Sequence, residues 1–550
     1  MFIKVIKWAN NQIPNHYQDS VFYLEEDNWN DYSYYTYFHL HLSSKYTEDG
    51  ESKLIGGVKI LKKEQEINKG YLHSSDEFDT LNSEYCSLGQ SLDYYDRLAH
   101  IDKPLQDQLL SSINDIIFRP DIVDEFRDVE AFNISLMRHF DFNDDIFKLA
   151  PILISREFDA LPDNKDLKFK FKTKEMTDFI EFDFDSPKYP DEDGFDQFLP
   201  NRIAVIIGKN GSGKTTLLSK ISRIVFASAS DRDYLKAVAT IEPKGLGFPR
   251  IISLSYSAFD AFQVPGIRLK EKEQISKDIQ RGIGRYIYCG VRDITKELEK
   301  SIETIIPEEN GLLRMEDILN DKHADNFLKP INSLKKEFIE ALKIIFSDSE
   351  KSTMLLRVIQ ILSEESSLHF IRVISHPIQE NELIKIFSEL STGHKFVLHS
   401  LANIIKHIEN RSLILFDEPE THLHPPLLAV LMKSMRYILN NKNSFMILST
   451  HSPVVLQETL SKHVFIVRRE GNMINVLNPE IQTFGENIGI ITSHIFGLSS
   501  DLTDYHAELD SVISGSTAKN SKEGLEKIEA LFGGQLSFQA RAYVLSQLNN

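Results

Sequence analysis

Apolar and charged residues alternate in two neighbouring segments, Leu167–Lys172 and Ile180–Asp185. Strict alternation is the pattern of a strand with one buried and one exposed face. One segment carries lysines and the other carries acids, and facing opposite charges contribute about 0.2–1 kcal/mol each, so we expect an antiparallel hairpin. Two unrelated edge strands are the alternative. The predicted pairs are Lys172 with Glu181, Lys170 with Asp183, Lys168 with Asp185, Phe171 with Phe182 and Phe169 with Phe184.

Short apolar runs elsewhere in the chain are typical of buried strands. They are Ile203–Ile207, Ile251–Tyr256, Leu413–Phe416, Phe445–Leu448 and Val464–Val467. Helical patterns separate several of these runs, which predicts an α/β fold. Three further strands are expected near the N-terminus, at Val21–Leu24, Tyr32–Leu42 and Leu54–Leu61.

Two longer regions are predicted to be helical. The first spans Ser87 to about Phe147, and Pro104 lies where the first turn of a helix tolerates proline. The second spans about 266–388, and Pro307 and Pro330 interrupt it, so a long coiled coil is excluded. One apolar helical face is expected there, formed by Ile331, Leu334, Phe338, Leu342 and Ile345.

Composition narrows the class of protein. The 550 residues include 62 basic and 81 acidic side chains, and a net charge of −19 argues against a surface that coats nucleic acid. The two cysteines, Cys86 and Cys289, exclude a disulfide scaffold and fit a reducing compartment. Without a signal-peptide pattern or an apolar run of membrane-spanning length, we expect a cytoplasmic protein with no membrane partner.

A glycine-rich loop follows the predicted strand Ile203–Ile207 and precedes a predicted helix. It matches G-x-x-x-x-G-K-[ST], in which backbone N–H groups and a helix N-terminus bind phosphates. Lys214 is expected to bridge the β- and γ-phosphates of ATP during catalysis, and the Thr215 hydroxyl is expected to bind Mg²⁺. The expected nucleotide-binding residues are Gly208, Lys209, Asn210, Gly211, Ser212, Gly213, Lys214 and Thr215.

Two adjacent carboxylates, Asp417 and Glu418, follow the apolar run Leu413–Phe416. A carboxylate at the end of a buried strand can hold the Mg²⁺ shell, the role we predict for Asp417. Glu418 can polarise the attacking water as a general base. Taken alone, the pair could be solvated acids in a turn, but the phosphate loop favours the catalytic interpretation.

Another strand, predicted at Phe445–Leu448, is followed closely by His451. A histidine there can hydrogen-bond a γ-phosphate or the attacking water. Ser391 and Gly393 precede the helix that leads into the carboxylate strand, and a hydroxyl with free N–H groups can face an anion. An ordinary helix cap would have the same residues.

These motifs, in this order, resemble the ABC-class ATPases, and in particular their relatives with SMC/RecF-like heads. The similarity covers about residues 200–485 and includes a run similar to DEPE-x-HLHP, here Asp417–Pro425. The resemblance implies that Gly208–Thr216 is the Walker A loop, which adds Thr216 to the nucleotide site, and that Asp417–Glu418 is the Walker B motif.

The same resemblance implies that ATP is held between two subunits. Ser391 and Gly393 would be the signature that closes on ATP bound to a second copy, and His451 would be the switch histidine. Head-to-head dimers or higher oligomers would result, with ATP and Mg²⁺ as cofactors. The signature departs from the family pattern, because it reads Ser391-Thr-Gly-His394 instead of Ser-Gly-Gly-Gln, and this bears on the turnover rate. No clear glutamine loop is present, and Gln263 is its candidate.

Within that class the chain is most similar to the PtuA ATPases of Septu and retron-associated anti-phage defence systems. Such proteins imply an ATP-dependent switch that regulates a separate HNH nuclease subunit, similar to PtuB. Retron versions further imply a reverse transcriptase and its small multicopy DNA as partners.

We therefore expect an α/β, ABC-type ATPase head with a mixed sheet, an antiparallel β subdomain, a helical lobe and a helical insertion. The expected regions are an N-terminal elaboration (1–160), the hairpin and Walker A core (161–265), the helical insertion (266–388), the lobe with signature, Walker B and switch histidine (389–485), and a C-terminal helical region that could contact a partner (486–550).

Three other functions stay open. The protein could be a DNA-repair clamp without a nuclease partner, the ATPase subunit of a transporter, or a scaffold that binds ATP and hardly hydrolyses it. Two His-x-His pairs, at His39 and His41 and at His422 and His424, lack the cysteine and carboxylate neighbours of zinc sites and are expected to be structural.

Overall fold

The computed structural model describes residues 3–7, 19–27, 33–74, 76–161, 167–185, 200–257, 263–308, 311–321, 326–496, 505–515 and 521–549. Contacts within the chain divide it into two compact units, Met1–Phe484 and Gly485–Asn550.

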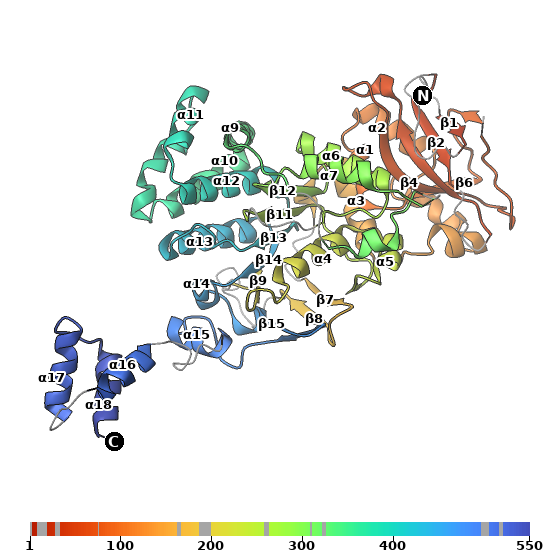
Figure 1. The fold of residues 1–550 in the computed structure, drawn as a ribbon. Helices are drawn as coiled ribbons and strands as arrows, with labels where there is room; N and C mark the ends of the chain where they lie inside the picture. Colours follow the sequence, from red (N-terminus) through yellow and green to blue (C-terminus); the bar gives the residue numbers. More distant parts are fainter. Residues whose placement is uncertain are drawn as a thin grey trace, which may run out of the picture. The chain divides into compact units, whose positions relative to one another are not determined.

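The central sheet of the first unit has seven strands in the order β12-β11-β13-β14-β9-β15-β16 (Figure 1). Neighbouring strands are parallel except β15 and β16, so the sheet is mixed and the predicted α/β class is confirmed. All five predicted buried strands belong to this sheet. The bounds are β9 Ile203–Ile207, β11 Ile251–Ser255, β12 Tyr286–Gly290, β13 Leu413–Asp417, β14 Phe445–Thr450, β15 Val464–Glu470 and β16 Met473–Leu477.

Helices cover both faces of this sheet (Figure 1). On one face, Leu217 and Ile221 of α4 (Lys214–Phe226) share a buried cluster with Leu415 of β13. The next residue of β13, Phe416, points to the opposite face, because successive side chains of a strand alternate. Its ring centroid lies 6.1 Å from that of Phe396 on α12 (Thr392–His407). Helix α13 (Pro425–Asn441) joins β13 to β14.

One predicted element is wrong in part. The stretch 266–388 was expected to be helical throughout, yet β12 lies within it and pairs with β11 at the edge of the sheet. Its five residues are all buried, and Gly282 and Gly284 precede it with φ of +66° and +90°. A short apolar run between glycines suits a buried parallel strand better than a helix.

The rest of that stretch is mainly helical. In α9 the predicted apolar face is buried at Phe338, Leu342 and Ile345, whereas Ile331 in the first turn is 58% exposed. The elements are α6 Leu269–Arg281, α7 Ile294–Thr304, α8 Met315–Leu319, α9 Ile331–Ser347, α10 Ser349–Leu362, the 3-10 segment Ser366–Ser375 and α11 Glu380–Glu389.

The predicted hairpin exists, but its register is wrong by two residues. Strands β7 (Lys168–Thr173) and β8 (Ile180–Asp183) pair antiparallel, with Lys168 opposite Asp183 and Lys170 opposite Glu181. A six-residue turn, 174–179, separates the strands, and the Lys172 amine donates to the Thr177 carbonyl in that turn instead of facing Glu181. A shift of two residues leaves every side chain on its predicted face. Strand β10 (Ala239–Glu242) completes this sheet beside β7.

The N-terminal region forms a six-stranded sheet in the order β5-β1-β2-β3-β4-β6, which includes the three strands predicted there. The region predicted to be helical from Ser87 begins instead with Ser87 in β6, and Pro104 lies in the first turn of α2 as expected. The bounds are β1 Ile3–Ile6, β2 Phe22–Glu26, β3 Tyr37–Leu42, β4 Lys53–Lys62, β5 Glu77–Phe78, β6 Tyr85–Gly89, α1 Leu92–Leu98, α2 Lys103–Ser112 and α3 Asp145–Ser155.

Helix α1 is buried along its whole length and ties the N-terminal sheet to the central one. Its charged side chains all find partners beyond that sheet. The pairs are Asp93 with Arg285 at 2.9 Å, Asp96 with Arg250 at 2.6 Å and Arg97 with Asp278 at 3.0 Å. Both cysteines, Cys86 and Cys289, are buried and free.

The second unit is helical. Leu509, Leu525, Ile528 and Val544 form its apolar cluster. Its helices are α15 Ile488–Phe496, α16 Tyr505–Ser514, α17 Ser521–Leu531 and α18 Phe538–Asn549. Across the described ranges of both units, no helix combines the length and apolar character that a membrane crossing requires.

Candidate nucleotide site

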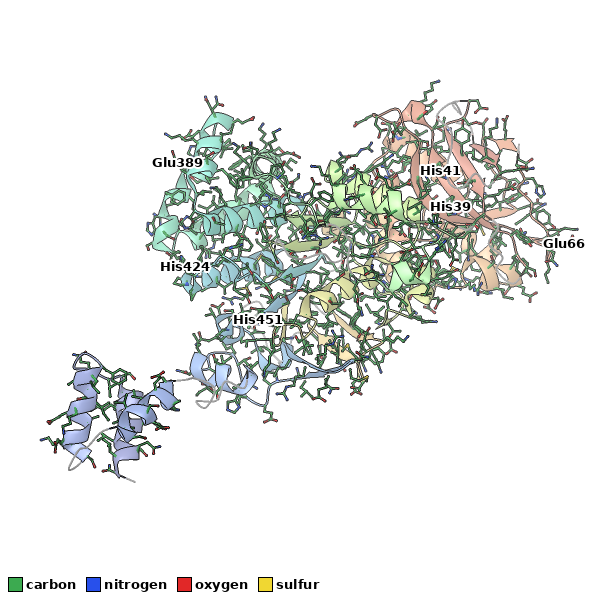
Figure 2. The ribbon with its side chains drawn as sticks, in the orientation of Figure 1. His39, His41, Glu66, Glu389, His424 and His451 are labelled. Atoms are coloured by element: carbon green, nitrogen blue, oxygen red, sulfur yellow. The ribbon has the colours of Figure 1, made fainter. Side chains whose placement is uncertain are left out.

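Three loops meet at one edge of the central sheet. Strands β9, β13 and β14 are parallel neighbours in the order β13-β14-β9, so their carboxyl ends lie together. The phosphate loop follows β9, Asp417 and Glu418 lie at the end of β13, and His451, labelled in Figure 2, follows β14. Ligands of open α/β sheets bind at this edge.

The phosphate loop has the backbone shape that an anion requires. Gly211 and Gly213 have φ of +79° and +95°, which favour glycine. A Cβ on Gly208 would lie 2.5 Å from the Val467 carbonyl oxygen, so only glycine fits there. The Ser212 hydroxyl is buried and has no hydrogen-bond partner among the described residues. Helix α4 begins at Lys214, and no side chain of the described residues caps its first N–H groups. Free donors in a curled loop are suited to bind phosphate.

The outer part of this loop is open to solvent. Lys209, Asn210 and Gly211 are exposed, and Thr216 is half-buried in the first turn of α4. The loop residues predicted from the sequence are therefore contiguous around the start of α4.

Lys214 lies inside the site. Its Nζ is 3.3 Å from the Gly208 carbonyl oxygen and 2.6 Å from Nε2 of His451. Burial lowers the pKa of Lys214, and the nearby carboxylates of Glu418, Asp417 and Glu420 oppose that effect. A cation that has lost its hydration water gains the most free energy from a bound phosphate, because the phosphate oxygens take the place of that water.

Thr215 and Asp417 are placed as the predicted metal ligands. The Thr215 hydroxyl donates to Oδ2 of Asp417 at 2.8 Å, and the Ser449 hydroxyl donates to Oδ1. Adjacent oxygens of an octahedral Mg²⁺ shell lie roughly 3 Å apart, because each metal–oxygen bond is about 2.1 Å. The donor set therefore fits Mg²⁺, with Ser449 orienting the carboxylate.

Glu418 and His451 face each other across the ends of β13 and β14. Nε2 of His451 lies 3.2 Å from Oε1 of Glu418, and this contact holds the pKa of the carboxyl below its usual value. The same nitrogen faces Lys214, and one ring nitrogen cannot accept a hydrogen bond from Lys214 and donate a hydrogen bond to Glu418 at once. Movement of Lys214 toward a phosphate therefore frees Nε2 to donate to Glu418.

The backbone at Glu418 is unusual. Its φ is +44°, and Pro419 follows it. Both a positive φ and a following proline restrict a residue with a side chain, so the surroundings must hold this turn. Such conformations concentrate at functional sites.

The signature residues lie apart from this cluster. No hydrogen bond in the described ranges joins Ser391 or Gly393 to the phosphate loop. The exposed Ser391 caps α12 by accepting the His394 N–H at 3.3 Å, and Nε2 of His394 lies 3.1 Å from the Ser367 hydroxyl. A Cβ on Gly393 would lie 2.8 Å from the carbonyl oxygen of His422, in the run that follows Glu418.

The candidate for the glutamine loop, Gln263, is turned inward. Its amide oxygen accepts from buried Lys272 at 3.0 Å, and its amide nitrogen lies 3.4 Å from the Asp317 carbonyl oxygen. The Ser219 hydroxyl, one turn after Thr215 on α4, donates to the Gln263 carbonyl at 3.2 Å. The backbone of Gln263 thus contacts the phosphate-loop helix, while its side chain does not point to the phosphate loop.

Two residues at the site were not assigned a role from the sequence. Ser449 orients Asp417, and Glu420 accepts a hydrogen bond from the His451 backbone. A polar residue at the end of an apolar strand, and a third acid directly after Asp417 and Glu418, were the available signals. The His-x-His pairs hold no metal cluster in the described chain: His39 and His41 pair with acids of the N-terminal sheet, and His424 caps α13 (Figure 2).

Comparison with known proteins agrees with an ATPase core. Residues 267–457, which include the signature, Asp417, Glu418 and His451, match the family described as "AAA domain, putative AbiEii toxin, Type IV TA system". The chain is 29% identical over 546 residues to "Protein ea59" of Escherichia phage lambda, covering 96% of this chain and 95% of the relative. It is 26% identical over 211 residues to the "Retron Vc95 probable ATPase" of Vibrio cholerae, covering 34% of this chain and 40% of that protein.

Solved structures with similarity to the chain include the SMC head domain from Thermotoga maritima, at 14% identity and a TM-score of 0.25, covering 57% of this chain and 99% of that one. The ATP-binding cassette MJ1267 of an ABC transporter matches at 11% identity and a TM-score of 0.25, covering 60% and 94%. These scores are too low to carry an argument, so the fold class rests on the sheet topology. The matched AAA domain and the geometry of the site agree with an ATPase core.

Proposed function

We propose that the protein binds and hydrolyses ATP at the edge formed by β9, β13 and β14. The observation that carries this proposal is the contact series from Lys214 through His451 to Glu418, with distances of 2.6 and 3.2 Å, beside a glycine-rich phosphate loop whose Ser212 hydroxyl has no hydrogen-bond partner among the described residues. Lys214 and the loop would hold the phosphates. Glu418 would orient a water molecule and accept its proton, and His451 would fix the position of Glu418. Mg²⁺ held by Thr215 and Asp417 would neutralise phosphate charge and polarise the γ-phosphoryl group.

The ATPase is further proposed to work as a head-to-head dimer or higher oligomer. Ser391 is exposed, and among the described residues it is bonded only within the first turn of α12, where its hydroxyl accepts the His394 N–H and its carbonyl accepts the Lys395 N–H. Its hydroxyl can still donate to a nucleotide on a second copy. Two nucleotides between two copies would then complete each site. Ser391→Arg should block ATP-dependent association without weakening ATP binding by the single chain, which a nucleotide titration can measure.

ATP-driven association is proposed to act as a switch in anti-phage defence, with an HNH nuclease as the regulated partner. The family description names a putative AbiEii toxin of a type IV TA system, and the Vibrio relative is named as a probable ATPase of a retron, which supports this setting. A reverse transcriptase and its multicopy DNA are the further proposed partners. The cutting activity is assigned to the HNH nuclease partner.

This proposal is tested by infection and by affinity purification. Cells that carry the gene with its neighbours should resist phage, and Glu418→Gln should change that resistance. A tagged chain should capture an HNH protein from the same cells. Because one relative is a phage lambda protein, the panel should contain lambda-like and unrelated phages. Unchanged plaque counts with every phage, together with capture of no nuclease, would remove the defence role and leave the ATPase.

A scaffold that binds ATP and hardly hydrolyses it is the second candidate. His394 stands where the ABC pattern has glutamine, and its ring is bound to Ser367 and lies 5.9 Å from the Phe370 ring. A side chain held within its own lobe contributes less to a nucleotide on a second copy. Steady-state turnover near background with tight ATP binding would favour this candidate.

A further inference from the structure

The side chain of Glu420 connects the two loops that carry the catalytic groups. Glu420 lies in the turn after β13, two residues beyond Glu418. Its Oε1 accepts the backbone N–H of His451, the residue directly after β14. The other oxygen, Oε2, is buried and has no hydrogen-bond partner among the described residues.

This hydrogen bond fixes the His451 backbone where its ring reaches the site. From that position Nε2 lies within 2.6 Å of Lys214 and 3.2 Å of Glu418. The turn that carries Glu420 is itself anchored, because the Thr421 N–H donates to the Glu418 carbonyl at 3.1 Å and the Glu418 N–H donates to the Ser449 carbonyl at 3.0 Å. The hydrogen bonds of this turn therefore hold both the strained backbone of Glu418 and the ring of His451 in place.

Burial of a carboxylate with one unsatisfied oxygen costs free energy, and here burial raises the pKa of Glu420. A glutamine would avoid the charge and keep the acceptor oxygen. The hydrogen bond to the His451 N–H therefore requires the length of this side chain and not its charge.

We propose that Glu420 is a positioning residue, which holds the backbone of His451 so that its ring stands between Lys214 and Glu418. The inference rests on the proposed ATP hydrolysis and adds to it the residue that aligns two of its groups. A misplacement of about 1 Å can cost roughly 100-fold in rate, so one backbone hydrogen bond here can control turnover.

Four variants of the full chain test this proposal. Glu420→Asp keeps the charge but shortens the side chain, so turnover should fall by roughly 100-fold, with the KM for ATP little changed. Glu420→Gln keeps the length and an acceptor oxygen, so it should retain most of the turnover. His451→Ala should be impaired, and adding Glu420→Asp to it should cause little further loss, because residues that act through each other are not additive.

Glu458→Ala is the control. This acid pairs with Arg436 outside the site, and its loss should leave turnover unchanged. Thermal unfolding of each variant separates misplacement from misfolding, and Glu420→Gln supplies the comparison if another variant fails to fold. The proposal is overturned if Glu420→Asp outperforms Glu420→Gln, since charge would then matter more than reach, or if the two losses multiply in the double variant.

Failure of this inference differs from failure of the ATPase proposal. Full turnover in Glu420→Asp removes the positioning role alone. No turnover in the wild-type chain, or full turnover in Glu418→Gln, removes the ATPase proposal itself.

Discussion

At the scale of single residues, the groups expected to bind ATP and Mg²⁺ form hydrogen bonds with one another, and a bound nucleotide would replace these bonds. Lys214 donates to His451, and Thr215 donates to Asp417. The first pair joins the predicted phosphate ligand to the predicted switch histidine, and the second joins the two predicted metal ligands. A bound phosphate would draw Lys214 away from His451, and Mg²⁺ would replace the hydrogen bond between Thr215 and Asp417, so binding and alignment of the site are coupled.

Lys214→Ala should weaken ATP binding by roughly 10- to 100-fold, because a charge-assisted hydrogen bond contributes about 1.5–3 kcal/mol. Calorimetric titration of the full chain with ATP and Mg²⁺ measures this. Lys209→Ala is the matched control, since Lys209 is an exposed lysine of the same loop and should matter less. Equal losses in both variants would contradict the assignment of Lys214.

Gly393→Ala tests the close contact between α12 and the chain that follows Glu418. Alanine usually stabilises a helix by about 0.5–1 kcal/mol relative to glycine. Here the added Cβ would lie 2.8 Å from the His422 carbonyl oxygen, so we expect a net loss of about 1–3 kcal/mol from overpacking. Thermal unfolding should show a lower Tm for Gly393→Ala than for the control Gly70→Ala, whose Cβ would meet only ordinary contacts near 3.5 Å.

At the scale of elements, the sequence was most informative where local pattern and function coincide. The strands before Gly208, Asp417 and His451 were predictable because each is a short apolar run that is followed by residues of a recognisable functional motif. Strand β12 was not, because five apolar residues amid helical sequence do not show which sheet they join. The hairpin register depended on the length of the turn 174–179, which alternation does not encode. Glu420 was visible as an acid, but its partner is a backbone N–H brought close only by the parallel pairing of β13 and β14.

Helix α1 carries the clearest prediction at this scale. Arg285 pairs with Asp93 and also donates to the carbonyls of Phe226 and Phe248. Arg285→Ala would leave Asp93 buried without this partner, which typically costs 3–5 kcal/mol. The free energy of unfolding measured in urea should fall strongly for this variant. It should fall by less than about 0.5 kcal/mol for Lys103→Ala, which breaks an exposed pair with Asp107. Similar shifts in both would show that α1 is not held by its ion pairs.

At the scale of the whole molecule, the charge of −19 and the split arrangement of the site favour work through partners. Among the described residues no hydrogen bond joins the phosphate loop to the signature of the same chain, and we propose that a second copy completes each site. Glu418→Gln should therefore accumulate as a dimer with ATP and Mg²⁺, because it binds but cannot complete the reaction. Light scattering should give twice the 63.2 kDa of one chain, and chelation of Mg²⁺ should return the monomer mass. A measured mass that does not change when ATP and Mg²⁺ are added would contradict the ATP-dependent dimer.

The central claim is that this sheet edge hydrolyses ATP through Glu418. Phosphate release by the full chain with ATP and Mg²⁺, measured beside Glu418→Gln under conditions where both bind ATP equally, tests it most directly. Loss of a general base should lower turnover by roughly 100- to 10,000-fold while ATP affinity is preserved. Equal phosphate release by the two proteins would contradict the account.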